Sequence, residues 1–117
     1  MSGASTIRDG RPGLFGSAGQ SRTDVLSGAG TLSLNPQQDG QIVIANASHT
    51  VNLPALADCG PGWGCTIINT DMANTVTVDP DGTEQINGGA TLPITGTDFQ
   101  GAFITNDGSQ WVAVVAP

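Results

Sequence analysis

The sequence predicts an all-β protein: an antiparallel β-sandwich or jelly-roll-like barrel of about eight to nine short strands, with an extended N-terminal arm. Two observations support this class. From residue 31 onward, short runs rich in Val, Ile and Thr alternate with turn signals at intervals of roughly ten residues. No segment shows the periodicity of an amphipathic helix. The spacing therefore favours strands that are joined by tight turns.

Nine runs are predicted as strands. In chain order they are residues 31–34, 41–45, 50–53, 65–69, 75–79, 84–87, 90–95, 101–105 and 111–115. Several are separated by dipeptides that supply the positive φ angles of tight turns, namely Asp39-Gly40, Asp81-Gly82, Asn87-Gly88 and Asp107-Gly108. The clearest predicted hairpin covers residues 101–115 and turns at the last of these dipeptides.

Alternation within the runs predicts the core. Five apolar pairs at positions i and i+2 are expected to face inward: Ile42 and Ile44, Val51 and Leu53, Val76 and Val78, Leu92 and Ile94, Val112 and Val114. The opposite faces carry Thr, Asn, Gln and Ala, and the pattern leaves open whether water or another subunit covers them. No repeat with a period of roughly 20 to 50 residues is evident, so a solenoid is not expected.

The first 30 residues differ in composition from the rest. They hold seven Gly and Pro12 and show no sustained periodicity. Residues 1–30 are therefore predicted as an extended arm, and residues 31–117 as one β-sandwich domain. The arm is expected to lie across neighbouring subunits or a larger assembly. Its predicted docking residues are the apolar Ile7, Leu14 and Phe15 and the cationic Arg8, Arg11 and Arg22.

The charge is distributed unevenly along the chain. There is no Lys; residues 1–22 hold three Arg and one Asp, giving +2, whereas residues 23–117 hold nine acids and no Lys or Arg, giving −9. This asymmetry indicates a short basic arm on an acidic body. Because an acidic body repels nucleic acid and anionic membranes, neither is an expected partner. No apolar stretch suits a membrane span or a signal peptide, so synthesis in the cytoplasm is expected.

The residues that could carry chemistry are few. His49 is the single histidine, and no nucleophile motif accompanies it, so the sequence does not predict an enzyme. Asp79, Asp81 and Glu84 concentrate three carboxylates within six residues and are a weak candidate for a Ca²⁺ site. The same stretch is also a good type I turn, which is the favoured interpretation. No phosphate-binding loop is present, and no cofactor is expected.

Cys59 and Cys65 flank a Gly-rich loop that contains Trp63. The spacing is compatible with a disulfide between them. Free thiols are equally compatible, because cytoplasmic synthesis favours reduced cysteines. A zinc site is much less favoured, because two Cys and one distant His leave a tetrahedral set incomplete. Trp63 is expected to fold back over the end of the domain rather than to act as an interface anchor.

Five segments together resemble β-rich modules of tailed-bacteriophage virions. They are Thr-Val-Asn-Leu-Pro-Ala at 50–55, Gly-Trp-Gly-Cys-Thr-Ile-Ile-Asn at 62–69, Thr-Val-Thr-Val-Asp-Pro-Asp-Gly at 75–82, Gln-Ile-Asn-Gly at 85–88 and Gly-Ala-Phe-Ile-Thr-Asn-Asp-Gly-Ser-Gln-Trp at 101–111. Similar modules occur in head decoration proteins, head fibres and tail-fibre segments. The resemblance implies a non-catalytic virion component that is commonly trimeric, and it transfers no catalytic residue.

Within that class, one short domain with an arm favours a decoration, or cement, protein over a fibre. We therefore expect a homotrimer that binds the major capsid protein on the outer surface of the virion and stabilises the shell by many weak contacts. A head-fibre or tail-fibre module that binds a receptor is the first alternative. A carbohydrate-binding module is the second.

Overall fold

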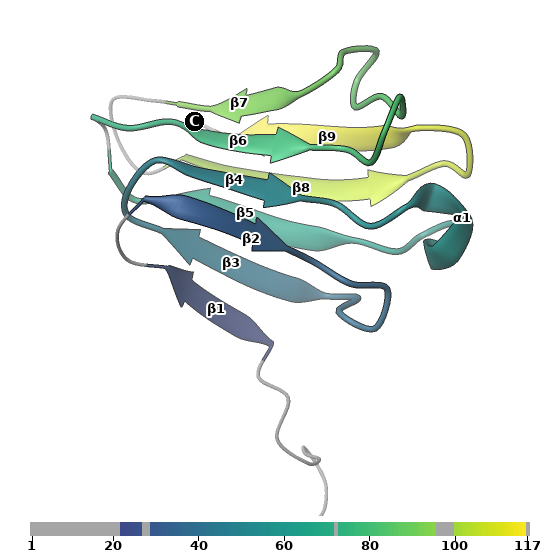
Figure 1. Ribbon diagram of the computed structural model, residues 1–117, viewed down its shortest axis with the longest axis horizontal. Helices are drawn as coiled ribbons and strands as arrows, with labels where there is room; N and C mark the ends of the chain where they lie inside the picture. The colour runs from purple at the N-terminus through teal and green to yellow at the C-terminus, as the bar shows by residue number, and fades with distance from the viewer. Residues whose placement is uncertain (1–21, 27–28, 72, 96–99, 117) are drawn as a thin grey trace, which may run out of the picture.

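The computed structural model describes residues 22–26, 29–71, 73–95 and 100–116. Within these ranges the chain forms nine strands and one short helix (Figure 1). The elements are β1 (Thr23–Leu26), β2 (Gly30–Ser33), β3 (Gln41–Ala45), β4 (His49–Asn52), α1 (Leu56–Cys59), β5 (Cys65–Asn69), β6 (Val76–Asp79), β7 (Leu92–Ile94), β8 (Gln100–Asn106) and β9 (Trp111–Ala116). The prediction of an all-β protein is confirmed.

The strands form two mixed sheets. One has five strands in the order β1-β3-β5-β8-β9, and the other has four in the order β2-β4-β6-β7. Strands β1 to β6 alternate between the sheets, so their neighbours within each sheet run parallel. Strands β7, β8 and β9 pair antiparallel. The predicted antiparallel arrangement is therefore correct for three of the seven strand pairs and wrong for the other four.

The first six strands wind around the core as a short superhelical coil. Each superhelical turn of this coil adds one strand to each sheet (Figure 1). Partners in neighbouring turns are 19 residues apart for Thr23 and Ile42, 24 for Gln41 and Cys65, and 27 for His49 and Val76. The later turns are longer because the connection from β4 to β5 contains α1 and a Gly-rich loop. These unequal turns give no fixed period, which agrees with the absence of a repeat in the sequence, so a search for repeats does not reveal the winding.

The predicted strands match the structure except at three places. The run at residues 84–87 forms only isolated bridges, through Ile86, and is not a strand. Strand β1 lies inside the range predicted as an arm, and it pairs in register with β3. The short helix α1 was not predicted. The β-structure therefore begins by Thr23, eight residues before the predicted boundary at residue 31.

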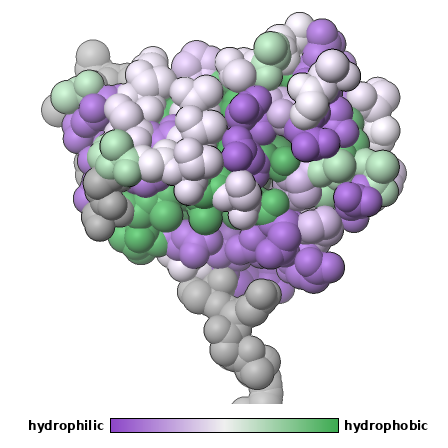
Figure 2. Space-filling view, in the orientation of Figure 1, coloured by the Kyte–Doolittle hydropathy of each residue, from purple (hydrophilic) through white to green (hydrophobic). Residues whose placement is uncertain are grey.

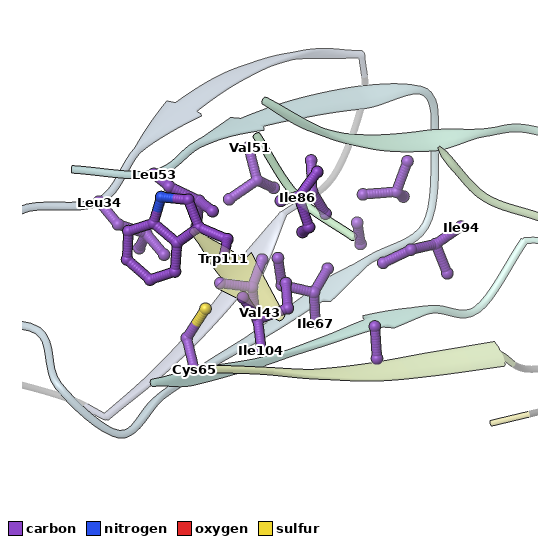
Figure 3. Close-up of a cluster of buried hydrophobic side chains, with 14 of the residues drawn as sticks. Leu34, Val43, Val51, Leu53, Cys65, Ile67, Ile86, Ile94, Ile104 and Trp111 are labelled. Carbon is purple, nitrogen blue, oxygen red and sulfur yellow. The ribbon is translucent and has the colours of Figure 1, made fainter. Parts of the chain in front are cut away.

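The core lies between the two sheets, which contribute side chains from both sides (Figure 3). Its buried apolar members are Leu34, Val43, Ala45, Val51, Leu53, Trp63, Cys65, Ile67, Val76, Val78, Ile86, Ile94, Ala102, Ile104 and Trp111. Three predicted inward pairs are confirmed: Val51 and Leu53, Val76 and Val78, and Leu92 and Ile94. All three pairs lie in or directly after strands of the four-stranded sheet.

The other two predicted pairs point the wrong way. In β3, Val43 is buried while Ile42 faces outward, and in β9 Trp111 is buried while Val112 and Val114 are exposed. Both strands are apolar at successive positions, so alternation alone does not say which face is inside. The inward choice follows Trp111, which has the largest of the fully buried side chains.

The turns follow the predicted chemistry. The four glycines of the predicted turn dipeptides, Gly40, Gly82, Gly88 and Gly108, all have positive φ. The predicted hairpin is also present, because β8 pairs antiparallel with β9 from Gly101 with Ala116 to Asn106 with Trp111.

Trp63 folds back into the end of the core, as predicted. Its side chain is 4% exposed, and its indole nitrogen donates a hydrogen bond of 2.9 Å to the carbonyl oxygen of Pro36. The Trp63 ring packs edge-to-face against Trp111. The tryptophan therefore fills the core rather than presenting an anchor at an interface.

Candidate functional site

The outer face of the five-stranded sheet is the candidate functional surface. Its outward residues follow from the register: Thr23 and Val25 on β1, Ile42 and Ile44 on β3, Thr66 and Ile68 on β5, Gly101, Phe103 and Thr105 on β8, and Val112, Val114 and Ala116 on β9. We call this set the apolar face. Every strand of the sheet contributes to it.

Large apolar side chains project from the apolar face into solvent. The most exposed are Val25 at 71%, Val114 at 67% and Phe103 at 54%, followed by Ile42 and Val112. These five are all of the exposed large hydrophobic residues among those the structure describes. Single exposed apolar side chains are ordinary on protein surfaces, but a contiguous apolar patch marks an interaction site.

The apolar face contains no Asp, Glu, Lys, Arg or His, although the whole chain has a net charge of −7. The one acidic side chain of β1, Asp24, sits between the outward Thr23 and Val25 on the opposite side of the strand and accepts a hydrogen bond of 2.8 Å from Gln41. A partner could therefore cover this sheet without burying a charge.

The outer face of the four-stranded sheet has a different chemistry. One row consists of Thr31, Thr50 and Thr77, and a second consists of Ser33, Asn52 and Asp79. This sheet lies in front in Figure 1, and hydrophilic and intermediate residues cover much of the side nearest the viewer in Figure 2. The two outer faces therefore differ sharply in polarity.

A hollow of about 440 Å³ lies where β2, β4 and β6 end. It is lined by Ser33, Leu34, Asn52, Leu53, Pro54, Asp79, Pro80, Asp81 and Gly82. Within it, the amide nitrogen of Asn52 donates a hydrogen bond of 3.1 Å to the hydroxyl of Ser33. Parallel strands end on the same side, which explains why residues distant in sequence meet here.

The three carboxylates considered for Ca²⁺ do not act together. Glu84 turns to α1, where its carboxylate accepts hydrogen bonds from the backbone nitrogen of Leu56 at 3.0 and 3.2 Å, and it also accepts one from the Trp111 indole at 3.3 Å. Asp79 and Asp81 line the hollow without it. Nowhere in the described ranges do three or more His, Cys, Asp or Glu side chains gather to hold a metal ion. The weak metal candidate therefore gains no support from the geometry.

Cys59 and Cys65 are free thiols. Burial raises the pKa of the Cys65 thiol to about 12, with smaller contributions from Asp39 and Cys59. The pKa of Cys59 is also raised, first by burial and then by the charges of Asp58, Glu84 and Asp39. Neither cysteine has the lowered pKa of a reactive nucleophile.

Of the six predicted docking residues in the arm, the structure describes only Arg22. Its guanidinium donates a hydrogen bond of 2.6 Å to the carbonyl oxygen of Asp39 in the turn before β3. Arg22 therefore contacts its own domain. Ile7, Arg8, Arg11, Leu14 and Phe15 lie outside the described residues, and their docking role stays a prediction.

The free edge of β9 is occupied by a side chain. The amide group of Asn87 donates to the carbonyl oxygen of Ala113 at 3.0 Å and accepts from the Ala113 nitrogen at 2.9 Å. Beside it, the backbone of residues 85–87 pairs with Trp111. This bonding satisfies the groups that a further strand would use. New strands are therefore blocked at the start of β9, whereas the opposite edge of the sheet is β1.

His49 is buried although its sequence neighbours, Ser48 and Thr50, are polar. It is 8% exposed and lies at the start of β4, and its Nδ1 is 3.4 Å from the carbonyl oxygen of Ala47.

In the part of the chain that the structure describes, no helix is long and apolar enough to cross a membrane. No protein-family model and no curated protein sequence matches the chain.

Proposed function

We propose that the protein is a non-enzymatic structural subunit of a bacteriophage virion, which decorates the outer capsid as a trimer and stabilises the shell. The observation that carries the proposal is the apolar face. A sheet that presents five exposed large apolar side chains and no charge, in an otherwise acidic protein, is typical of a subunit that works in an assembly.

The distribution of charge supports the same role. Nine acidic residues and no Lys or Arg follow residue 22, so an assembled particle coated with this domain would carry a strongly negative exterior. Such a surface keeps particles from associating with one another. The Arg-containing residues 1–22 would supply the contacts with the major capsid protein, where complementary charge favours docking.

The mechanism is mechanical. Each copy contributes weak contacts, and linking several copies converts them into tight binding by raising the effective concentration of the remaining sites. A trimer bound across several capsid subunits would resist their separation under the pressure of packaged DNA. No cofactor and no bond-breaking step are required.

The test is to add purified protein to undecorated capsids and measure both binding and capsid survival during heating. The proposal expects saturable binding and a higher temperature of capsid rupture. A variant lacking residues 2–21 should lose binding, whereas the surface variant Thr31→Ser should bind as the parent does. Failure of the full chain to bind capsids would rule out decoration.

A receptor-binding head-fibre or tail-fibre module is the second candidate, because the hollow beside Asp79 offers hydroxyl, amide and carboxylate groups. These are the groups that bind sugar hydroxyls by hydrogen bonds. Binding of the protein to host cells or glycans, abolished by Asp79→Ala but not by Thr31→Ser, would favour this candidate over decoration.

A further inference from the structure

We propose that the apolar face is the surface through which copies of this chain associate, so that the face of one copy is covered by that of another. Because the same face is used by both copies, the contact pairs two chains and is additional to the contacts that would build the proposed trimer. It does not depend on capsid binding, because the same association would occur in the purified protein.

The first argument is electrostatic. Two chains of net charge −7 repel one another, and the described body has acids on its loops and on its four-stranded sheet. The apolar face is the sheet surface from which charge is absent. Contact there keeps the acids at the rim or on the far side, where salt at physiological strength screens charges over about 8 Å. A second copy can therefore approach closely here without desolvating a carboxylate.

The second argument is area. Five strands spaced about 4.8 Å apart, each about 13 to 23 Å long, give a footprint of roughly 400 Å². The accessible area is larger because the side chains stand clear of the sheet. Two faces together would bury on the order of 1,000 Å², close to the lower limit for specific interfaces. The face is therefore large enough for a partner of its own size and shape.

The third argument is shape. Phe103 projects from β8, and Gly101 lies two residues away on the same face of the same strand. A Cβ built on Gly101 would meet only ordinary contacts, at 3.7 Å from Ile67 and Ile68, so the absence of a side chain leaves a recess rather than relieving a clash. The face thus carries a projecting ring beside a recess, and a second copy provides a recess for each ring.

The neighbouring positions suit the same contact. Val114 lies opposite Phe103 on β9, and Ile68 lies opposite Gly101 on β5. β-Branched side chains on two sheets interdigitate when the sheets stack about 10 Å apart. The pairing of β9 with residues 85–87 and the Asn87 side chain obstructs edge-to-edge addition at the start of that strand. The other edge strand, β1, has only four residues, so stacking over the whole face gives the larger contact.

The experiment is to measure the mass of the purified full-length protein by light scattering, from micromolar to submillimolar concentration. We expect a dimer of the 11.8 kDa chain, because a face that covers a copy of itself pairs two chains. Phe103→Asp should reduce it to monomer, or weaken association at least tenfold, whereas Thr31→Asp on the exposed part of β2 should not. Circular dichroism confirms folding, and Phe103→Ser provides a second variant should the charge disturb the fold. Raising salt should preserve association.

Three results would overturn the proposal: a monomeric parent chain at the highest concentration, an oligomer that resists both Phe103 variants, or an oligomer lost only when residues 2–21 are deleted. The last would assign the contact to the N-terminal segment. An oligomer that dissociates in Phe103→Asp but binds no capsid would support this interface while refuting decoration.

Discussion

Replacing Asn87 tests whether its side chain stabilises the sheet as the geometry indicates. The amide makes two hydrogen bonds to the backbone of Ala113, and the residue adopts a φ of 51°. A hydrogen bond contributes about 0.5 to 1.5 kcal/mol net, and the lower end applies because water can reach this site. Asn87→Gly removes both bonds and tolerates the positive φ, so it should lower the free energy of unfolding by about 1 kcal/mol.

Asn87→Ala removes the same bonds and places a Cβ in the left-handed region, which costs about 1 to 2 kcal/mol more. The expected total is about 2 to 3 kcal/mol. For a chain of this size, that corresponds to a drop in Tm of roughly 4 °C for the Gly variant and about 8 to 12 °C for the Ala variant.

Urea unfolding followed by circular dichroism, with calorimetry for Tm, gives both quantities. The measurements are best made on the Phe103→Asp background, so that association does not contribute to stability. A Gly variant as stable as its parent would show that the amide bonds contribute nothing. Equal losses in the Gly and Ala variants would refute the cost assigned to the positive φ.

Three further predictions concern other parts of the chain. On the same background, Val43→Thr should lower the free energy of urea unfolding by about 1 to 3 kcal/mol, because it buries a hydroxyl. Ile42→Thr should lower it by less, because Ile42 faces outward. The reverse order would contradict the register of β3. The pKa of Asp107 is lowered from 3.8 by hydrogen bonds from the backbone nitrogens of Ser109 and Gln110 and from the Ser109 hydroxyl. The stabilisation by these bonds is therefore complete above pH 3.8 and is lost as the pH falls through the lowered pKa of the folded state. The stability difference between the parent and Asp107→Ala should thus be constant from pH 7 to about 5 and shrink at pH 3; a difference that grows on acidification would contradict this sign. With a pKa of about 12, Cys65 is a thiolate in only about one molecule in ten thousand at pH 8, so iodoacetamide should label Cys59 first by mass spectrometry; equal labelling rates would contradict its burial.

The sequence predicts strand positions well and strand partners poorly. Val, Ile and Thr runs and Gly-containing turns are local signals, so eight of the nine predicted runs overlap strands, and the hairpin at Asp107-Gly108 is present. Parallel pairing joins residues about 20 or more positions apart and has no turn to reveal it. The coil of β1 to β6 was missed for that reason.

The candidate surface was missed because the sequence pattern does not identify the inward side of β3 and β9. Ile42-Val43-Ile44 and Val112-Ala113-Val114 are apolar on both sides of the strand, so the pattern permits either register. Alternation assigns Ile42 and Val114 to the core, whereas both lie on the apolar face. An apolar run without alternation was the available signal that both sides of the strand are apolar.

The packing of Trp63 against Trp111 has a spectroscopic consequence. The ring centroids are 5.6 Å apart with planes inclined at 77°, and the chain contains no Tyr. Two indoles this close couple their electronic transitions, and one belongs to the loop before β5 while the other begins β9. The fold therefore contains an optical reporter of its own, whose signal depends on native tertiary packing and vanishes in a state that keeps only its strands.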